Sequence, residues 1–320
     1  MDKVLEETLR RCDANEAVAL CTVVAARGST PQSAGARMLL LADGRTVGTL
    51  GGGCVEAEVR QQAMRILEAH ASKLLTFKLD HDYGWDDGLI CGGTMDIFVQ
   101  TFADASAVES IRRAVNEICA GRETTIRIEY EVEGKPLAYS ETIEPAPKLL
   151  IVGAGHVGQA LATQASALGF EVTVLDDRAD CASPERFPTA RHIVADIEST
   201  LRQYPFDPQS FVVIVTRGHR HDGRALAAVI DAPSKYVGLI GSRRKVLTIF
   251  QDLMSQGVAM EKLLRVHAPI GLELGAVTVP EIATSIAAEL IAVRRGRGDD
   301  VAKPMKFDPV KLAEALESAT

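Results

Sequence analysis

The chain has 320 residues, a length that favours two domains over one. Apolar residues make up 47% of it and charged residues 24%, which is ordinary for a globular protein and excludes a disordered chain or a small disulfide scaffold. With 43 acidic against 35 basic residues the formal net charge is −8, which argues against a broad nucleic-acid surface but leaves a local basic site open.

The N-terminus and the cysteines indicate a cytoplasmic protein. The first residues, MDKVLEETLRRCDANEAVALCTVV, have neither the basic lead nor the apolar run of a signal peptide, and no stretch reaches the ~20 apolar residues of a membrane span. None of the six cysteines forms a Cys-x-x-Cys pair, so we expect no structural zinc site. Cys21 and Cys119 lie in apolar segments and are expected in the core. Cys54 and Cys91 instead adjoin glycine clusters, where the backbone lets a ligand approach closely.

Residues 1–144 are predicted to form a mixed α/β (α+β) domain. In chain order, the pattern predicts a helix over 2–11, strands over 17–26, 36–41 and 46–50, a helix over 55–70, a strand over 73–79, a loop over 81–93, a strand over 94–101, a helix over 107–120 and a hairpin of 124–132 with 136–143. His81 in the loop is either a proton-transfer residue or an ordinary loop histidine. The prolines of Pro145-Ala146-Pro147 favour an extended linker, and we place the domain boundary there.

Residues 148–320 are predicted to form a Rossmann-like, doubly wound parallel-sheet domain. Strands are expected over 148–152, 171–175, 191–194, 211–216 and 236–240, and helices over 156–168, 224–230, 243–253 and 279–293. Such alternation is typical of βαβ units in a parallel sheet. The apolar spacing of the last helix suits a dimer interface, but we favour packing on the sheet.

A glycine fingerprint joins the first strand of this second domain to its first helix. The G-x-G-x-x-G pattern and the histidine inside it comprise Gly153, Gly155, His156 and Gly158. Asp176 ends the next strand, 18 residues after the third glycine. This context predicts a dinucleotide fold in which the helix N-terminus receives a phosphate. Fold does not determine the ligand, so NAD(P) stays open; Asp176 would favour NAD over NADP, and the nearby Arg178 weakens that preference.

Basic residues follow two later strands of the same domain. They are Arg217, His219 and Arg220 after the strand over 211–216, and Arg243 and Arg244 after the strand over 236–240. Residues 213–245 hold seven Lys/Arg against two Asp/Glu. The carboxyl ends of parallel strands line one crevice, so we expect a phosphate or pyrophosphate site beside the glycine loop. The alternative is a solvated basic surface, but cations at a helix N-terminus oppose its dipole, which favours a ligand. A metal at His219 and His221 would need a third ligand, and none is obvious.

The chain resembles the XdhC/CoxI family, the accessory factors of molybdenum hydroxylases such as xanthine dehydrogenase. In the first domain the resemblance rests on RGSTP at 27–31, GTLGGGCVE at 48–56 and GLICGG at 88–93. In the second it rests on the glycine fingerprint, GLIGSRRK at 238–245 and VHAPIGL at 266–272. The similarity extends from about residue 16 to 296. Gln32 is a departure, since the family often has Arg after the proline.

This resemblance implies an accessory chaperone without a conventional turnover reaction. Such a factor binds molybdenum cofactor, assists its sulfuration by a cysteine desulfurase, and inserts it into an apo-hydroxylase, and we expect a homodimer. Cys54 or Cys91 would contact molybdenum or carry sulfur, and Gly51, Gly52 and Gly53 would admit the bulky ligand. This cofactor is a pterin with a phosphate group and a molybdenum centre, and the glycine loop and the basic residues of the second domain would hold the phosphate group. The alternative function is an NAD(P)-dependent oxidoreductase; neither nucleic acid nor membrane is expected as a partner.

Overall fold

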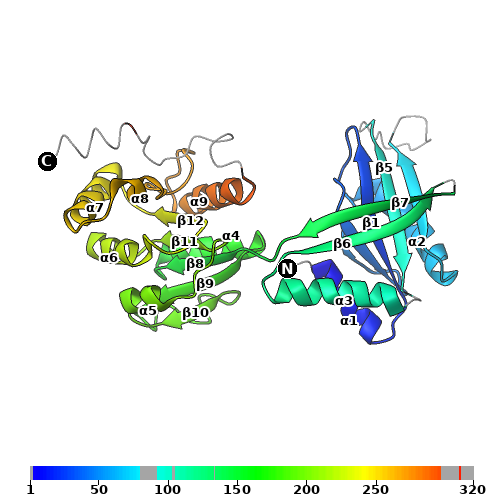
Figure 1. Cartoon of the computed structure of the whole chain (residues 1–320), viewed down its shortest axis with the longest axis horizontal. Helices are drawn as coiled ribbons and strands as arrows, with labels where there is room; N and C mark the ends of the chain where they lie inside the picture. The colour runs from blue at the N-terminus through cyan, green and yellow to red at the C-terminus, as the bar shows by residue number, and fades with distance from the viewer. Residues whose placement is uncertain (1–2, 80–91, 103–104, 133, 297–309, 311–320) are drawn as a thin grey trace. The chain divides into compact units, whose positions relative to one another are not determined.

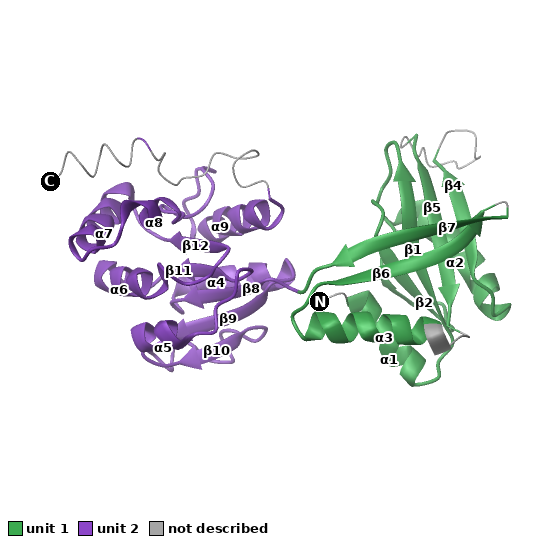
Figure 2. Cartoon of the chain, viewed as in Figure 1, with its two compact units in different colours: residues 1–145 green, residues 146–320 purple. Residues whose placement is uncertain are grey.

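The computed structural model describes residues 3–79, 92–102, 105–132, 134–296 and 310 (Figure 1). The chain divides into two compact units, Met1–Pro145 and Ala146–Thr320, as Figure 2 shows. The division lies within the Pro145-Ala146-Pro147 segment. Among the helices of the described residues, none combines the length and the apolar character needed to span a bilayer.

A five-stranded antiparallel sheet forms the centre of the first unit, in the order β3-β2-β1-β5-β4. The strands are β1 (Val18–Arg27), β2 (Arg37–Leu41), β3 (Thr46–Gly48), β4 (Lys73–Lys78) and β5 (Thr94–Thr101). Residues 18–24 of the central strand β1 are all buried. Successive side chains of a strand point to opposite faces, so seven consecutive buried residues mean that both faces of the sheet are covered.

Helices and a hairpin cover the two faces of this sheet (Figure 1). They are α1 (Lys3–Asp13), α2 (Gly53–Glu68), α3 (Ala105–Cys119), β6 (Thr124–Val132) and β7 (Lys135–Ile143). Cys21 and Val23 pack on the side of α2, while Leu20 and Val24 pack on the side of α1, α3 and β6. This alternation follows from the two-residue period of a strand.

The expectation of a buried Cys119 is wrong, whereas Cys21 is buried as predicted. Cys119 is exposed at the last position of α3. The buried residues of that helix include Ile111, Ala114 and Ile118. One step along a helix turns the side chain by about 100°, so the residue after Ile118 points away from the core.

The second unit contains a five-stranded sheet, in the order β10-β9-β8-β11-β12, in which every neighbouring pair is parallel. The strands are β8 (Lys148–Val152), β9 (Glu171–Asp176), β10 (Arg191–Val194), β11 (Phe211–Ile214) and β12 (Tyr236–Leu239). From β8 the chain adds β9 and β10 on one side, and it then returns to add β11 and β12 on the other side of β8. The topological switch point therefore lies between β8 and β11, as in the doubly wound folds that the alternation predicts.

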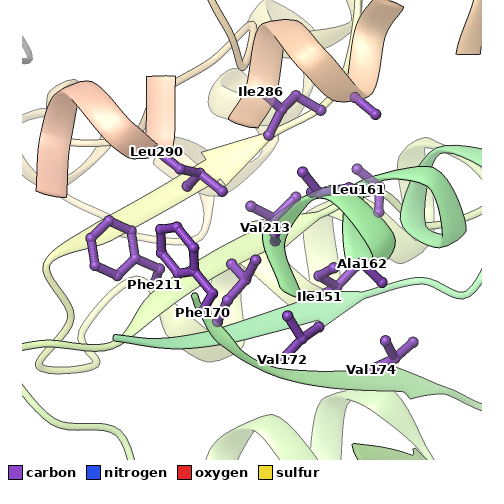
Figure 3. Close-up of a cluster of buried hydrophobic side chains, with 14 of the residues drawn as sticks. Ile151, Leu161, Ala162, Phe170, Val172, Val174, Phe211, Val213, Ile286 and Leu290 are labelled. Atoms are coloured by element: carbon purple, nitrogen blue, oxygen red, sulfur yellow. The ribbon is translucent and has the colours of Figure 1, made fainter. Parts of the chain in front are cut away.

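Helices cover both faces of the parallel sheet (Figure 1). They are α4 (His156–Ala167), α5 (Ile197–Gln203), α6 (His219–Val229), α7 (Arg243–Ser255), α8 (Met260–Leu264) and α9 (Val279–Arg294). Figure 3 shows one core, in which Leu161 of α4 and Leu290 of α9 pack over Val213 of β11. Helix α9 thus packs on the sheet, as we favoured. The other face carries α5, α6, α7 and α8.

Helix α6 begins at His219, five residues before the predicted start at Arg224. Gly218 is the N-cap with φ of +128°, a conformation that suits glycine. The Asp222 carboxylate in the first turn accepts hydrogen bonds from the Thr216 backbone N–H at 3.1 Å and hydroxyl at 2.6 Å. These bonds fasten the first turn to the end of β11. His219 and His221 are therefore helical.

Candidate functional site

The glycine loop after β8 has two closely packed glycines and one open glycine. A Cβ on Gly153 would lie 2.4 Å from the Val215 carbonyl oxygen, and one on Gly158 would lie 2.1 Å from the Gly153 oxygen. At Gly155, the N-cap of α4, a Cβ would meet nothing within 4 Å, and no side chain caps the helix. Gly153 and Gly158 therefore serve the turn and the packing. Gly155 presents open backbone at a helix N-terminus, the arrangement that suits a phosphate.

Asp176 is buried behind this loop and is only 2% exposed. Its carboxylate accepts hydrogen bonds from the Ala154 backbone at 2.7 Å and from the Arg178 backbone at 3.0 Å. The Arg178 guanidinium donates two more, each at 2.9 Å. Burial alone would raise the pKa of Asp176, but these bonds outweigh it and lower the pKa to about 2. The carboxylate thus holds the glycine loop in place through bonds to Ala154 and Arg178.

A second acid–base pair lies at the same edge of the sheet. Arg217 donates a 2.7 Å hydrogen bond to Asp177. Asp177 follows β9 and Arg217 follows β11, and β8 lies between these two strands. The pair therefore connects the two flanks of the glycine loop.

The remaining basic residues lie at the starts of α6 and α7. His219 and Arg220 are exposed in the first turn of α6, and Arg243 and Arg244 are exposed in the first turn of α7. Lys245 instead forms an ion pair with Asp222, which is 0% exposed. Because acids neutralise Lys245 and Arg217, the positive charge at this edge is smaller than the residue count over 213–245 predicts.

In the first unit, three segments that are distant in sequence meet. Ser29 and Gly92 form a parallel bridge, and a Cβ on Gly93 would lie 2.3 Å from the Ser29 oxygen. A Cβ on Gly51 would lie 2.5 Å from the Pro31 side chain. The segments 27–31, 48–56 and 92–93 therefore pack together at one place, and glycines allow the close approach.

Glu56 fixes the loop that leads into α2. One of its carboxylate oxygens accepts hydrogen bonds from the Thr49 hydroxyl at 2.7 Å and from the backbone N–H groups of Leu50 and Gly52, each at 3.1 Å. Burial raises the pKa of Glu56, but the three donors outweigh it and leave the pKa below its ordinary value. The side chain acts as a brace inside the loop.

This brace positions Cys54 beside open backbone. Cys54 is partly buried in the first turn of α2. A Cβ on Gly52 or Gly53 would meet nothing within 4 Å. A thiol next to a rigid, uncovered glycine pair can contact a bulky ligand. Cys91 and His81, the other candidates from this unit, lie outside the described residues.

Comparison with known proteins identifies the family. A profile described as the XdhC and CoxI family matches residues 12–78, and one described as the XdhC Rossmann domain matches residues 149–290. This chain belongs to the XdhC/CoxI family. The resemblance and the fold class predicted from the sequence are thus confirmed.

Relatives of this XdhC/CoxI chain carry different descriptions. YqeB of Escherichia coli K12, described as uncharacterized, is 31% identical over 91% of the chain, which spans 46% of YqeB. A protein of Bacillus subtilis 168, described as a probable xanthine dehydrogenase subunit, is 27% identical, covering 88% of the chain and 94% of that protein. The molybdenum cofactor insertion chaperone PaoD of Escherichia coli K12 is 22% identical, covering 89% and 86%.

The fold of the XdhC/CoxI chain also occurs in a solved structure. A crystal structure described as a xanthine dehydrogenase from Bacillus halodurans matches with a TM-score of 0.80 and 24% identity. The match covers 92% of this chain and 96% of that one. The two chains therefore share their fold over nearly their whole length.

The XdhC/CoxI motif at 266–272 belongs to a buried network that sequence reasoning missed. Glu289 of α9 accepts hydrogen bonds from the Tyr236 hydroxyl at 2.5 Å and from the Gly271 N–H at 2.8 Å. His267 Nδ1 lies 3.0 Å from the other Glu289 oxygen. Burial raises the pKa of Glu289, but His267 and the other donors outweigh it and lower the pKa. This motif therefore anchors α9 to the edge strand β12.

Within the described residues, no three His, Cys, Asp or Glu side chains form a metal-binding group.

Proposed function

We propose that this protein binds molybdenum cofactor and delivers it to a molybdenum hydroxylase such as xanthine dehydrogenase. The observation that carries the proposal is the open, uncapped backbone at Gly155, in a loop that Asp176 holds through Ala154. The similarity to a molybdenum cofactor insertion chaperone supports it. The cofactor is the cargo of this protein, so no conventional turnover reaction is required. An anionic phosphate and a metal centre are the two ends of the ligand that need recognition.

The second unit is proposed to bind a phosphate group. Gly155 and the N-terminus of α4 offer backbone N–H groups without a side-chain cap. Arg217, Arg243 and Arg244 follow neighbouring strands and are exposed, and a guanidinium pairs well with phosphate. His219 in the first turn of α6 completes the proposed set.

In the first unit, Cys54 is proposed to contact molybdenum or to carry sulfur. Cys54 offers a soft sulfur ligand, the type that suits molybdenum and sulfur transfer, beside the open backbone of Gly52 and Gly53. A role for Cys91 in place of Cys54 stays a prediction. The cysteine desulfurase as sulfur donor and the homodimer stay predictions as well.

An NAD(P)-dependent oxidoreductase is the less favoured alternative. A dinucleotide site of this fold uses the acid at the end of the second strand to bind the ribose hydroxyls. Here the carboxylate of Asp176 accepts four hydrogen bonds from Ala154 and Arg178. It has little capacity left for a ribose.

The test is the content of the purified protein. The chain is purified from a strain that makes molybdenum cofactor, and pterin, molybdenum and nicotinamide are measured per chain. We expect pterin and molybdenum in equal, near-stoichiometric amounts, and activation when the loaded protein is mixed with an apo-hydroxylase. Protein from a strain that lacks the cofactor is the control and should not activate. Stoichiometric nicotinamide without pterin would overturn the proposal in favour of the oxidoreductase.

A further inference from the structure

The two Asp–Arg pairs at the carboxyl edge of the parallel sheet differ in kind. Asp176 and Arg178 share three hydrogen bonds around a carboxylate that is 2% exposed. Arg217 and Asp177 share one hydrogen bond at 2.7 Å, and their side chains are 44% and 34% exposed. The other Asp177 oxygen lies 3.9 Å from the Arg178 guanidinium, too far for a hydrogen bond. A surface ion pair of the second kind shifts an equilibrium by at most about fivefold, so a ligand can displace it. The first pair is a fixed part of the loop, and the second is exchangeable.

The position of the exchangeable pair places it next to the proposed phosphate site. Its two residues follow β9 and β11, the strands that flank β8 and its glycine loop. Thr216, directly before Arg217, is held by the buried Asp222, so the backbone that carries Arg217 is anchored. The guanidinium can therefore change partners while its backbone stays in place.

We propose that Asp177 is an internal competitor that occupies Arg217 until a phosphate replaces it. This inference rests on the proposed function and specifies how the same proposed phosphate site selects its ligand. A phosphate monoester carries more negative charge than a carboxylate and accepts paired hydrogen bonds from a guanidinium, so it displaces Asp177. A ligand that offers only a carboxylate gains nothing by the exchange. The Asp177–Arg217 pair thus makes the proposed site favour phosphate esters over small carboxylic acids.

The experiment measures binding of inorganic phosphate, with acetate as the carboxylate probe, by ³¹P NMR titration and competition at constant ionic strength. In Asp177→Asn the competing charge is removed, and we expect phosphate to bind about two- to fivefold more tightly and acetate to compete better. Asp180→Asn is the matched control, because it removes the same charge from an exposed residue three positions further along the chain. Its effect should stay below about 1.5-fold, because salt screens charges that are not in contact with the ligand or with Arg217. Arg217→Gln should weaken phosphate binding. In the double variant, adding Asp177→Asn to Arg217→Gln should not restore or improve phosphate binding.

The outcomes separate this inference from the proposed function. Equal effects of Asp177→Asn and Asp180→Asn, weaker binding by Asp177→Asn, or a gain that persists without Arg217 would each overturn the exchange. The absence of phosphate binding by both wild type and Asp177→Asn would overturn it too. If the wild type retains the pterin cofactor but Asp177→Asn binds phosphate no better, only the exchange is wrong. If Asp177→Asn behaves as expected while the wild type never carries pterin, only the chaperone function is wrong.

Discussion

Asp176 at the end of β9 accepts a 2.7 Å hydrogen bond from the backbone N–H of Ala154 in the glycine loop after β8. The contact joins neighbouring strands through a buried charge, and Arg178 supplies the compensating cation. Burial of an unpaired carboxylate is costly, so the arrangement is stable only while all these donors are present. The acid that the sequence pattern assigns to a ribose is thereby a structural support of the loop.

Replacing this carboxylate should therefore give a stability change that depends on pH. The pKa of Asp176 is about 2 in the folded chain against an ordinary 3.8, so the unfolded state binds more protons as the pH falls between these values. The side chain is 3% exposed, and its ionisation contributes about 2 kcal/mol at neutral pH. Asp176→Asn should lose about that amount at pH 7, and its deficit should shrink as pH falls from 5 towards 2. Urea unfolding followed by circular dichroism measures both; a deficit that is independent of pH would contradict the assignment.

Substitutions at two glycines of the loop should affect different properties, stability at Gly158 and cofactor binding at Gly155. Gly158→Ala places a Cβ 2.1 Å from the Gly153 oxygen, so it should cost about 3 kcal/mol or more in unfolding free energy. Gly155→Ala is the matched variant, since its Cβ meets nothing within 4 Å and its φ of −72° suits alanine. It should fold normally but retain about tenfold less pterin cofactor, because the methyl group covers the open backbone. Normal retention by Gly155→Ala would show that the ligand does not approach here.

Glu56→Ala should loosen the loop before Cys54. The substitution leaves the Thr49 hydroxyl and the N–H groups of Leu50 and Gly52 without their acceptor, which should cost about 2 kcal/mol. Hydrogen exchange of residues 48–56 should speed up. Glu58→Ala, which removes a carboxylate bonded to Gln62 on the same helix, is the control and should leave this exchange unchanged. Equal exchange in both variants would refute the role of Glu56 as a brace.

Local patterns predicted the strands and most helices, but they missed α5, which Asp196 caps through the Ser199 N–H, and the short α8. Alternation and the glycine fingerprint gave β8 and the start of α4 correctly, since both signals lie within a few adjacent residues. The early start of α6 was missed because it depends on Asp222 reaching back to Thr216, although an acid in a first helical turn is a usable signal.

Contacts between distant residues had no local signal at all. Arg217 and Asp177 are 40 positions apart, and Tyr236 and Glu289 are 53 apart. Only the strand order brings the first pair together, and only the packing of α9 on the sheet brings the second. Sequence reasoning therefore found the positive charges of the site but not the acids that neutralise part of them.

The sharpest test of the first unit is the thiol of Cys54. Cys54→Ala removes one sulfur atom from a partly buried position at the start of α2, so the unfolding free energy should change by less than about 1 kcal/mol. If the thiol contacts the metal or carries sulfur, activation of an apo-hydroxylase should fall at least about tenfold, a loss of about 1.4 kcal/mol in transfer. Cys119→Ala, at the exposed end of α3, controls for the loss of a surface thiol and should activate normally. Full activation by Cys54→Ala would remove this residue from the proposed site and leave Cys91 as the candidate from the glycine clusters.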